Sequence, residues 1–336
     1  MSKGLSRTLC IISIMIAAAC LTGCSNKKTD EKRKVSVVTT IFPEYDWTRQ
    51  IVGNCENVDV KLLMKNGVDL HNFTPTADDI IRISTCDILI YVGGESDGWI
   101  QDALRNKKNK DLVEINLMKV LGDTVKEEEI VEGMEDEHHH EHGHEEDEHE
   151  DEHEHEHEDC EIEYDEHVWL SLRNAEKVCE RIALELGRLA PENSETFNEN
   201  LASYKNQLKD LDAEFASACK NIPSSTMIFC DRFPFRYFTE DYGINYFAAF
   251  TGCSAESEAS FETIAFLAKK IDGLNAPKVY VLEKSDGKIA KTVISNTKGK
   301  NAEIVALDSM QSTNTDDIKN GKTYISTMKK NLECLR

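Results

Sequence analysis

The segment NSETFNENLASYKNQLKDLDAEFASA (residues 193–218) divides the chain into two halves. Asn193 and Ser194 offer a helix N-cap with acidic residues following it. Apolar residues then recur every three or four positions, which is the spacing of one face of an α-helix; they are Phe197, Leu201, Tyr204, Leu208, Leu211 and Phe215. A helix from residue 192 to about residue 218 would be roughly 40 Å long at about 1.5 Å per residue. Such a helix can join two lobes as a rigid strut.

Short β-branched runs on either side of this segment alternate with helix-like stretches, a pattern typical of parallel βαβ sheets. The runs are residues 35–39, 58–64, 88–92 and 112–115 before it, and 226–230, 244–250, 278–283 and 302–307 after it. The sequence therefore predicts an α/β protein of two lobes, each with a four-stranded parallel sheet flanked by helices. We expect an N-terminal lobe over residues 35–191, a long rigid linking helix over 192–221 and a C-terminal lobe over 222–336.

The N-terminus predicts export. Lys3 and Arg7 precede an apolar run over residues 9–21, which is shorter than the ~20 residues of a membrane span and typical of a signal peptide. Residues 21–24, Leu-Thr-Gly-Cys, resemble the lipobox of bacterial lipoproteins. We expect a signal peptide over residues 1–23, a lipidated Cys24 and a charged tether up to residue 34. The mature protein would then be extracytoplasmic and anchored to the bacterial cell membrane.

The net charge of −23 comes from one tract. Residues 127–166 hold 23 acidic side chains, nine of the eleven histidines and no Lys or Arg, so the rest of the chain is neutral. A tract this polar cannot bury enough apolar surface to fold, so residues 127–164 are expected to form a disordered loop. Imidazole and carboxylate groups bind divalent cations. The loop is expected to act as a weak metal collector through His138, His139, His140, His142, His144, His149, His153, His155 and His157, although a plain solvated spacer is the alternative.

Other candidate metal ligands lie near the carboxyl ends of the expected strands, where ligands gather in parallel sheets. These residues are His71, Cys230, Asp231, Glu283 and Asp308, together with His167, which follows the acidic loop. Each has an ordinary alternative role. A lone histidine is usually a surface or core residue, and an acid after a strand can cap a helix.

Two segments resemble motifs of the zinc- and manganese-specific solute-binding proteins of ABC importers. Residues 67–79, GVDLHNFTPTADD, resemble G-x-D-P-H-x-Y-x-P-T-x-x-D, and residues 165–171, DEHVWLS, resemble D-P-H-x-W-L-S. The zinc members of that family commonly carry a loop rich in histidine and acidic residues before the second motif. The resemblance implies two α/β lobes joined by a long helix, His71 and His167 as metal ligands, and Zn²⁺ as the transported ligand, with Mn²⁺ as the alternative.

The third ligand is where the chain departs from that family, whose zinc members carry a histidine after the first strand of the second lobe. Counting from the strand puts Cys230 in that place, whereas counting back from Tyr242 puts Arg232 there, because the chain holds two extra residues. Arginine stays protonated and cannot ligate. A thiolate at Cys230 would favour zinc, and a carboxylate at Asp231 would favour manganese.

Cys230 has two further interpretations. It could form a disulfide with Cys253, because both residues follow neighbouring expected strands, or it could be an inert buried thiol. For the fourth ligand, the resemblance leaves Glu283 and Asp308 both open.

The expected function is that of a monomeric, lipid-anchored zinc receptor that delivers Zn²⁺ to an ABC permease. The alternatives are a manganese or iron receptor of the same family and a surface adhesin or metal-storage protein. A zinc hydrolase is disfavoured because the sequence holds neither an HExxH helix nor a G-x-S-x-G elbow. Nucleic acid is not an expected partner of an exported chain with this excess of negative charge.

Overall fold

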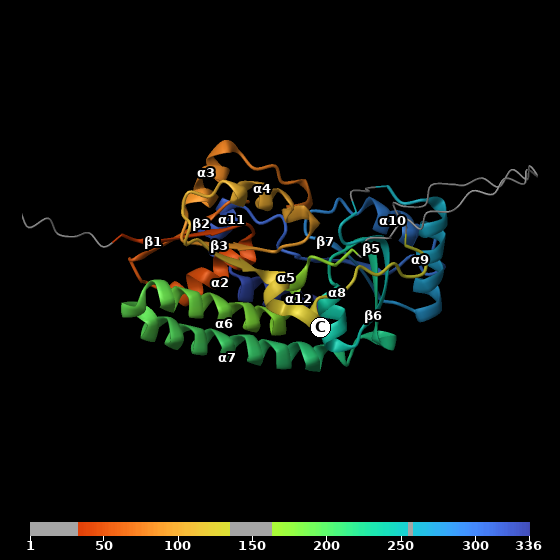
Figure 1. The fold of residues 1–336 in the computed structure, drawn as a ribbon. Coiled ribbons are helices and arrows are strands. Elements are labelled where there is room, and N and C mark those ends of the chain that lie inside the picture. Colours follow the sequence, from red (N-terminus) through yellow and green to blue (C-terminus); the bar gives the residue numbers. More distant parts are fainter. Residues whose placement is uncertain (1–32, 135–162, 255–257) are drawn as a thin grey trace, which may run out of the picture. The chain divides into compact units, whose positions relative to one another are not determined.

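Two four-stranded parallel sheets form the framework of the protein (Figure 1). The computed structural model describes residues 33–134, 163–254 and 258–336. The first sheet has the order β2-β1-β3-β4 and the second has the order β6-β5-β7-β8, so both repeat one strand arrangement. The strands are β1 (Val35–Thr39), β2 (Val58–Leu62), β3 (Ile88–Tyr91), β4 (Val113–Asn116), β5 (Thr226–Phe233), β6 (Asn245–Thr251), β7 (Lys278–Leu282) and β8 (Glu303–Leu307). The predicted fold class is confirmed.

Helices connect the strands of each sheet, as parallel pairing requires. The α-helices are α2 (Phe42–Val52), α3 (Ala77–Thr85), α4 (Trp99–Arg105), α5 (Leu117–Leu121), α6 (Leu172–Leu189), α7 (Ser194–Cys219), α8 (Arg236–Tyr242), α9 (Phe261–Leu274), α10 (Lys288–Ser295), α11 (Thr315–Lys319) and α12 (Tyr324–Leu335). Short 3₁₀ helices add η1 (Leu70–Asn72), η2 (Glu95–Asp97), η3 (Gly122–Thr124), η4 (Val168–Leu170), η5 (Pro191–Asn193) and η6 (Pro223–Ser225).

The central strands are buried on both faces, which explains why β3 and β7 are nearly continuous apolar runs. In β1, Val37 packs in the large core that extends across both lobes, and Val38 packs in a smaller cluster with α3 and α4. Successive side chains of a strand point to opposite faces. The outer face of the second sheet has its own cluster, which includes Val279 of β7 and Ile271 of α9.

The linking helix α7 runs from Ser194 to Cys219 and lies beside α6 (Figure 1). Its 26 residues span roughly 39 Å at about 1.5 Å per residue. Its apolar stripe is buried, and Phe215 stacks on Tyr242 of α8 with ring centroids 5.6 Å apart. Asn193 occupies the N-cap position, but its side chain makes no capping hydrogen bond. One apolar stripe therefore joins the long helix to both lobes.

The chain after β8 returns to the first lobe. The hydroxyl of Thr315, at the start of α11, donates to the carbonyl of Lys65, and the backbone N–H of Tyr324 in α12 donates to the Asp46 carboxylate in α2. The Tyr324 ring also meets Trp47 edge-on, with centroids 5.1 Å apart. The C-terminal helices thus tie the second sheet to the helices of the first lobe.

Part of the expected acidic loop is folded. Residues 127–134 cross to the second lobe, where the Glu129 carboxylate pairs with Arg236 and Val131 packs against the core. Glu127 and Tyr164 form an isolated antiparallel bridge, which brings the two ends of the tract together. The prediction of a disordered loop rests on the charge of the tract, and the few apolar side chains that anchor this segment contradict it for residues 127–134.

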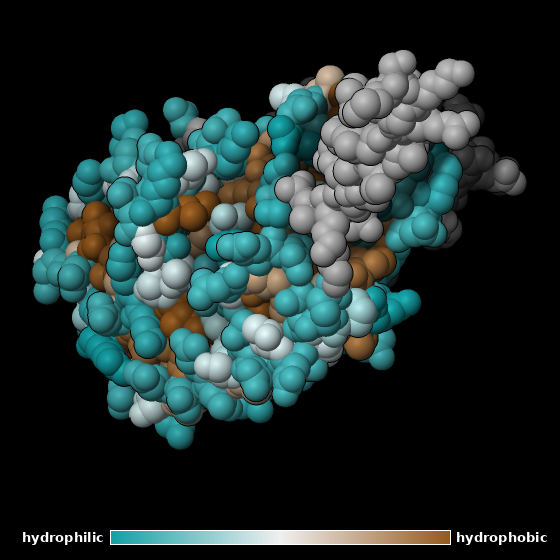
Figure 2. All heavy atoms as spheres, turned by 90° about the vertical axis from the view of Figure 1, so that its left-hand side faces the viewer, coloured by the Kyte–Doolittle hydropathy of each residue, from teal (hydrophilic) through white to brown (hydrophobic). Residues whose placement is uncertain are grey.

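Several sequence predictions lie outside the described residues: the signal peptide, the lipidated Cys24 and the nine histidines of the acidic tract. In the part of the chain that is described, every helix is either too short or too polar to cross a bilayer. On the face that Figure 2 shows, hydrophilic residues cover most of the surface and apolar residues form scattered spots.

Candidate metal centre

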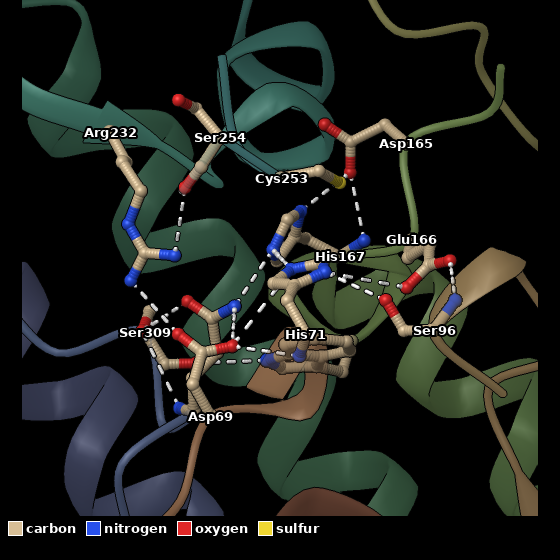
Figure 3. Close-up of polar contacts among 12 residues, drawn as sticks. Asp69, His71, Ser96, Asp165, Glu166, His167, Arg232, Cys253, Ser254 and Ser309 are labelled. Atoms are coloured by element: carbon tan, nitrogen blue, oxygen red, sulfur yellow. Dashed lines mark hydrogen bonds and ion pairs between the residues drawn. The ribbon is translucent and has the colours of Figure 1, made fainter. Parts of the chain in front are cut away.

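Two histidines from distant segments meet at the candidate site (Figure 3). His71 lies in η1, whose first turn is capped by the side chain of Asp69, and His167 immediately precedes η4. Their Nε2 atoms are 3.2 Å apart, and their ring centroids are 5.2 Å apart. Two unprotonated Nε2 atoms at this distance would point lone pairs at each other, so the pair calls for a proton or a cation between them.

The outer nitrogen of each ring has a partner that orients it. Nδ1 of His71 lies 2.7 Å from Oγ of Ser96, and Nδ1 of His167 lies 3.0 Å from Oδ1 of Asp165. The same Asp165 oxygen accepts the backbone N–H of His167 at 2.8 Å. An Nδ1–H donated outward leaves Nε2 free as a metal ligand, which is the usual arrangement of metal-binding histidines.

The side chain of Glu166 links the segment of His167 to the residues around His71. Its Oε1 accepts the backbone N–H of Ser96 at 2.8 Å, and its Oε2 lies 3.9 Å from Nδ1 of His71. A Cβ on Gly94 would lie 2.2 Å from Oε1 of Glu166, so the glycine makes room for this carboxylate. Glu166 thereby holds the turn that carries Ser96 against the His167 segment.

The two imidazoles have opposite proton affinities. Burial and the neighbouring His167 ring lower the pKa of His71 to about 3. Burial also disfavours a charged His167, but the Asp165 carboxylate outweighs it and the pKa of His167 is raised. His71 is therefore neutral over the whole physiological range, whereas the Asp165 carboxylate favours the protonated form of His167.

Cys253 completes a trio of potential ligands. One ring nitrogen of His71, one of His167 and Sγ of Cys253 lie within 4.8 Å of one another, and within the described residues this is the single such group of three. Cys253 follows β6, so the rule that selected the other candidates would also have selected it. The sequence suggests Cys253 only as a disulfide partner of Cys230.

Arg232 and Gln311 border the histidine pair. Arg232 donates to Oδ2 of Asp69 at 2.9 Å, an ion pair between the two lobes. Burial favours the neutral acid at Asp69, but His71 and Arg232 together lower the pKa of Asp69. Nε2 of Gln311 lies 2.9 Å from Nε2 of His167, and no pattern in the sequence pointed to this contact.

Cys230 and Asp231 lie apart from the histidine pair. Strand β5 continues to Phe233, so both residues are inside the strand and not beyond its carboxyl end. Cys230 packs in the apolar cluster on the outer face of the second sheet, and burial raises the pKa of its thiol to about 12. Asp231 accepts the backbone N–H of Leu282 at 3.3 Å. Neither residue belongs to the trio of potential ligands.

All seven described cysteines are free thiols, including Cys230 and Cys253. The disulfide that the sequence left open between these two residues is therefore not formed.

Glu283 and Asp308 already have polar partners. The Glu283 carboxylate accepts hydrogen bonds from the backbone N–H and hydroxyl of Ser309 and from the hydroxyl of Ser312. Asp308 pairs with Lys322 at 2.6 Å. Both acids thus hold the loop that carries Gln311 and lie outside the trio of potential ligands.

A polar cleft of about 800 Å³ lies next to the site. Asp69, Arg232, Glu283 and Gln311 are among its lining residues, so side chains of both lobes face it. The cleft thus reaches Asp69 and Gln311, which contact His71 and His167 respectively.

Two lobes of this topology, a long linking helix and a site enclosed between the lobes define the class of solute-binding proteins. Within that class, the chain belongs to the family described as the periplasmic component A of the zinc-uptake complex, whose model matches residues 37–336.

Relatives and solved structures agree with this membership. The "Zinc-binding protein AdcA" of Streptococcus pyogenes is 30% identical over 303 residues, which cover 90% of this chain and 56% of that protein. The chain thus spans about half the length of that relative. The "High-affinity zinc uptake system protein ZnuA" of Bacillus subtilis is 29% identical and is covered over 93% of its length, with 96% of this chain aligned. The Zn(II)-bound ZnuA-like domain of Streptococcus pneumoniae AdcA superposes with a TM-score of 0.66 at 25% identity, covering 90% of this chain and 97% of that domain.

Proposed function

We propose that this chain is an extracytoplasmic receptor that captures Zn²⁺ between its lobes and delivers it to an ABC permease. The 3.2 Å separation of the His71 and His167 Nε2 atoms carries the proposal. Two nitrogens that each lie about 2.05 Å from a tetrahedral zinc ion are about 3.3 Å apart. The pair is therefore already spaced to hold one zinc ion.

The buried surroundings favour binding over catalysis. His167 is fully buried, and three carboxylates lie close to the pair, namely Asp69, Asp165 and Glu166. Negative charge around a buried pair of imidazoles stabilises a divalent cation. Catalytic zinc keeps an open position for water and a general base beside it. The enclosed pair suits a receptor that holds its ion and releases it when the lobes separate.

The proposal extends to the chain's surroundings. Family membership and relatives such as the "Zinc-binding lipoprotein AdcA" of Streptococcus pneumoniae support a place outside the cytoplasm and anchorage through Cys24. The receptor would act as a monomer, and its partner would be the permease of a metal importer. The histidines between residues 138 and 157 would collect zinc near the cleft as many weak sites.

Zinc titration of the full chain by calorimetry, with a competing chelator, tests the proposal. We expect one tight ion and a weak tail, and both His71→Ala and His167→Ala should abolish the tight phase. His149→Ala, which removes one histidine of the acidic tract, is the matched control and should leave that phase intact. Many equivalent weak ions with no tight phase would instead indicate storage.

Competition between metals tests the choice of ion. Imidazole ligands favour zinc, whereas manganese prefers oxygen ligands. Zinc should therefore displace manganese and ferrous iron from the tight site. A protein that retains manganese in the presence of equimolar zinc would be the manganese receptor of the same family.

A further inference from the structure

Cys253 is held against the histidine pair by the local chain path. It follows β6 directly after Gly252, where a Cβ would lie 2.9 Å from Cε1 of His167. A side chain at residue 252 would thus push the imidazole away. Glycine at this position lets the Cys253 turn come into contact with the His167 ring, and the sulfur lies beside the two rings in Figure 3.

The sulfur is also oriented by the segment that carries His167. The backbone of Glu166 forms a hydrogen bond with the Cys253 thiol, and the backbone N–H of Cys253 donates to Oε1 of Glu128 at 3.4 Å. Three chain segments therefore meet at this cysteine. Cys230, by contrast, is enclosed by apolar side chains on the other face of the sheet. Burial and the neighbouring carboxylates raise the pKa of the Cys253 thiol, so the ion itself must displace its proton.

We propose that Cys253 supplies the third ligand of the zinc centre as a thiolate, in the role that the family gives to a third imidazole. This inference rests on the proposed function, because it completes the site of the same ion. It names a residue outside the segment in which the family pattern places that ligand. Counting back from Tyr242 puts Arg232 in the position of that ligand, but the Arg232 side chain forms an ion pair with Asp69.

The geometry requires only a small adjustment. Around a tetrahedral zinc ion, a sulfur at about 2.3 Å and a nitrogen at about 2.05 Å lie about 3.6 Å apart. The trio is within 4.8 Å before any ion enters, so closing by about 1 Å suffices. On binding, the S–H bond breaks, a Zn–S bond forms and the proton leaves to solvent. The thiolate then offsets one of the two positive charges of the ion.

A thiolate in this position narrows the class of ion. Soft thiolate ligands select zinc and cobalt(II) over manganese, whereas a site of imidazole and carboxylate alone discriminates less. The proposed thiolate therefore accounts for zinc selectivity without a third histidine.

Cobalt(II) is a direct probe, because a thiolate ligand produces a sulfur-to-metal charge-transfer band in the near ultraviolet. The full chain loaded with one equivalent of cobalt should show this band, and Cys253→Ser should lose it. Cys230→Ser, the control for a buried cysteine of the same lobe, should keep it. Removing an orienting partner of a ligand costs about 10- to 100-fold in affinity. Removing the ligand itself in Cys253→Ser should therefore weaken zinc binding by more than about 100-fold.

A second measurement does not depend on any variant. One equivalent of zinc should protect Cys253 of the wild-type chain from iodoacetamide, as read from the alkylated peptide. The inference is overturned if the wild type binds one zinc tightly but shows neither the cobalt band nor protection, or if Cys253→Ser binds zinc as tightly as the wild type. In either case the receptor proposal stands. Failure of the wild type to bind zinc tightly would overturn both.

Discussion

Asp97 provides a quantitative test of the electrostatics behind the histidine pair. It lies in η2, directly after the Ser96 that orients His71, and it is 2% exposed. Its Oδ2 accepts the backbone N–H of Gly93 at 3.0 Å, whereas its Oδ1 has no hydrogen-bond partner. Burial, together with the Glu166 carboxylate, raises the pKa of Asp97 to about 7.

The sign and size of the effect follow from linkage. The unfolded chain loses the Asp97 proton near the ordinary pKa of 3.8, whereas the folded chain keeps it until about pH 7. The contribution of Asp97 to stability is therefore fully present below about pH 4 and is lost as pH rises to 7. At about 1.36 kcal/mol per pH unit, the loss amounts to about 4 kcal/mol. The Glu44 carboxyl, whose pKa is raised by burial and by Asp97, acts in the same direction.

Asp97→Asn removes this titration and keeps an acceptor for Gly93. The free energy of unfolding of the variant minus that of the wild type should rise by up to about 4 kcal/mol between pH 4 and pH 8. Urea denaturation in EDTA at several pH values measures it. Asp102→Asn, at a position with a 70% exposed side chain in α4, is the matched control for an exposed acid. Parallel stability curves for Asp97→Asn and the wild type would refute the assignment of a protonated buried acid.

Three further substitutions probe the site and its framework. Asp165→Asn removes the charge that orients His167 and should weaken zinc binding about 10- to 100-fold with the fold intact, as calorimetry can show; unchanged affinity would contradict the orienting role. Gly252→Ala should displace the His167 ring and weaken zinc binding, whereas Gly273→Ala in α9, where a Cβ meets nothing within 4 Å, should leave it unchanged. Phe215→Ala should lower the free energy of unfolding by about 3–5 kcal/mol in urea, because the ring is fully buried between the lobes; a loss under 1 kcal/mol would mean that α7 is not packed as described.

The fold was predictable because its signals are local and repeated. Apolar runs bounded by turns marked all eight strands to within a few residues, and the central strands had the clearest runs because they are buried on both faces. The stripe from Phe197 to Phe215 marked α7 because a helix packed along one face keeps apolar residues every three or four positions. The return of α12 to the first lobe could not be predicted, because its contact between Tyr324 and Trp47 joins residues far apart in the sequence.

The site was predictable only where a motif fixes both the residue and its place on the chain. His71 and His167 each lie in such a motif, and the structure brings them together. Gln311 carries no pattern of its own, and its contact with His167 depends on the loop that Glu283 holds through Ser309. A contact that depends on a further segment of the chain cannot be predicted from the spacing of residues within one segment.

The placement of the third ligand turns on the geometry of β5. Phe229 pairs with Ala248 and Arg232 with Phe250, so three steps on β5 match two on β6 and one residue is extra. Such a bulge bends the strand and re-aims the side chains that follow it. Counting from the strand start places Cys230 in the position of the third ligand, but Cys230 packs in the apolar cluster on the outer face of the sheet. Arg232 instead meets Asp69 across the lobes, and the sulfur that lies beside the histidine pair is that of Cys253, which follows β6.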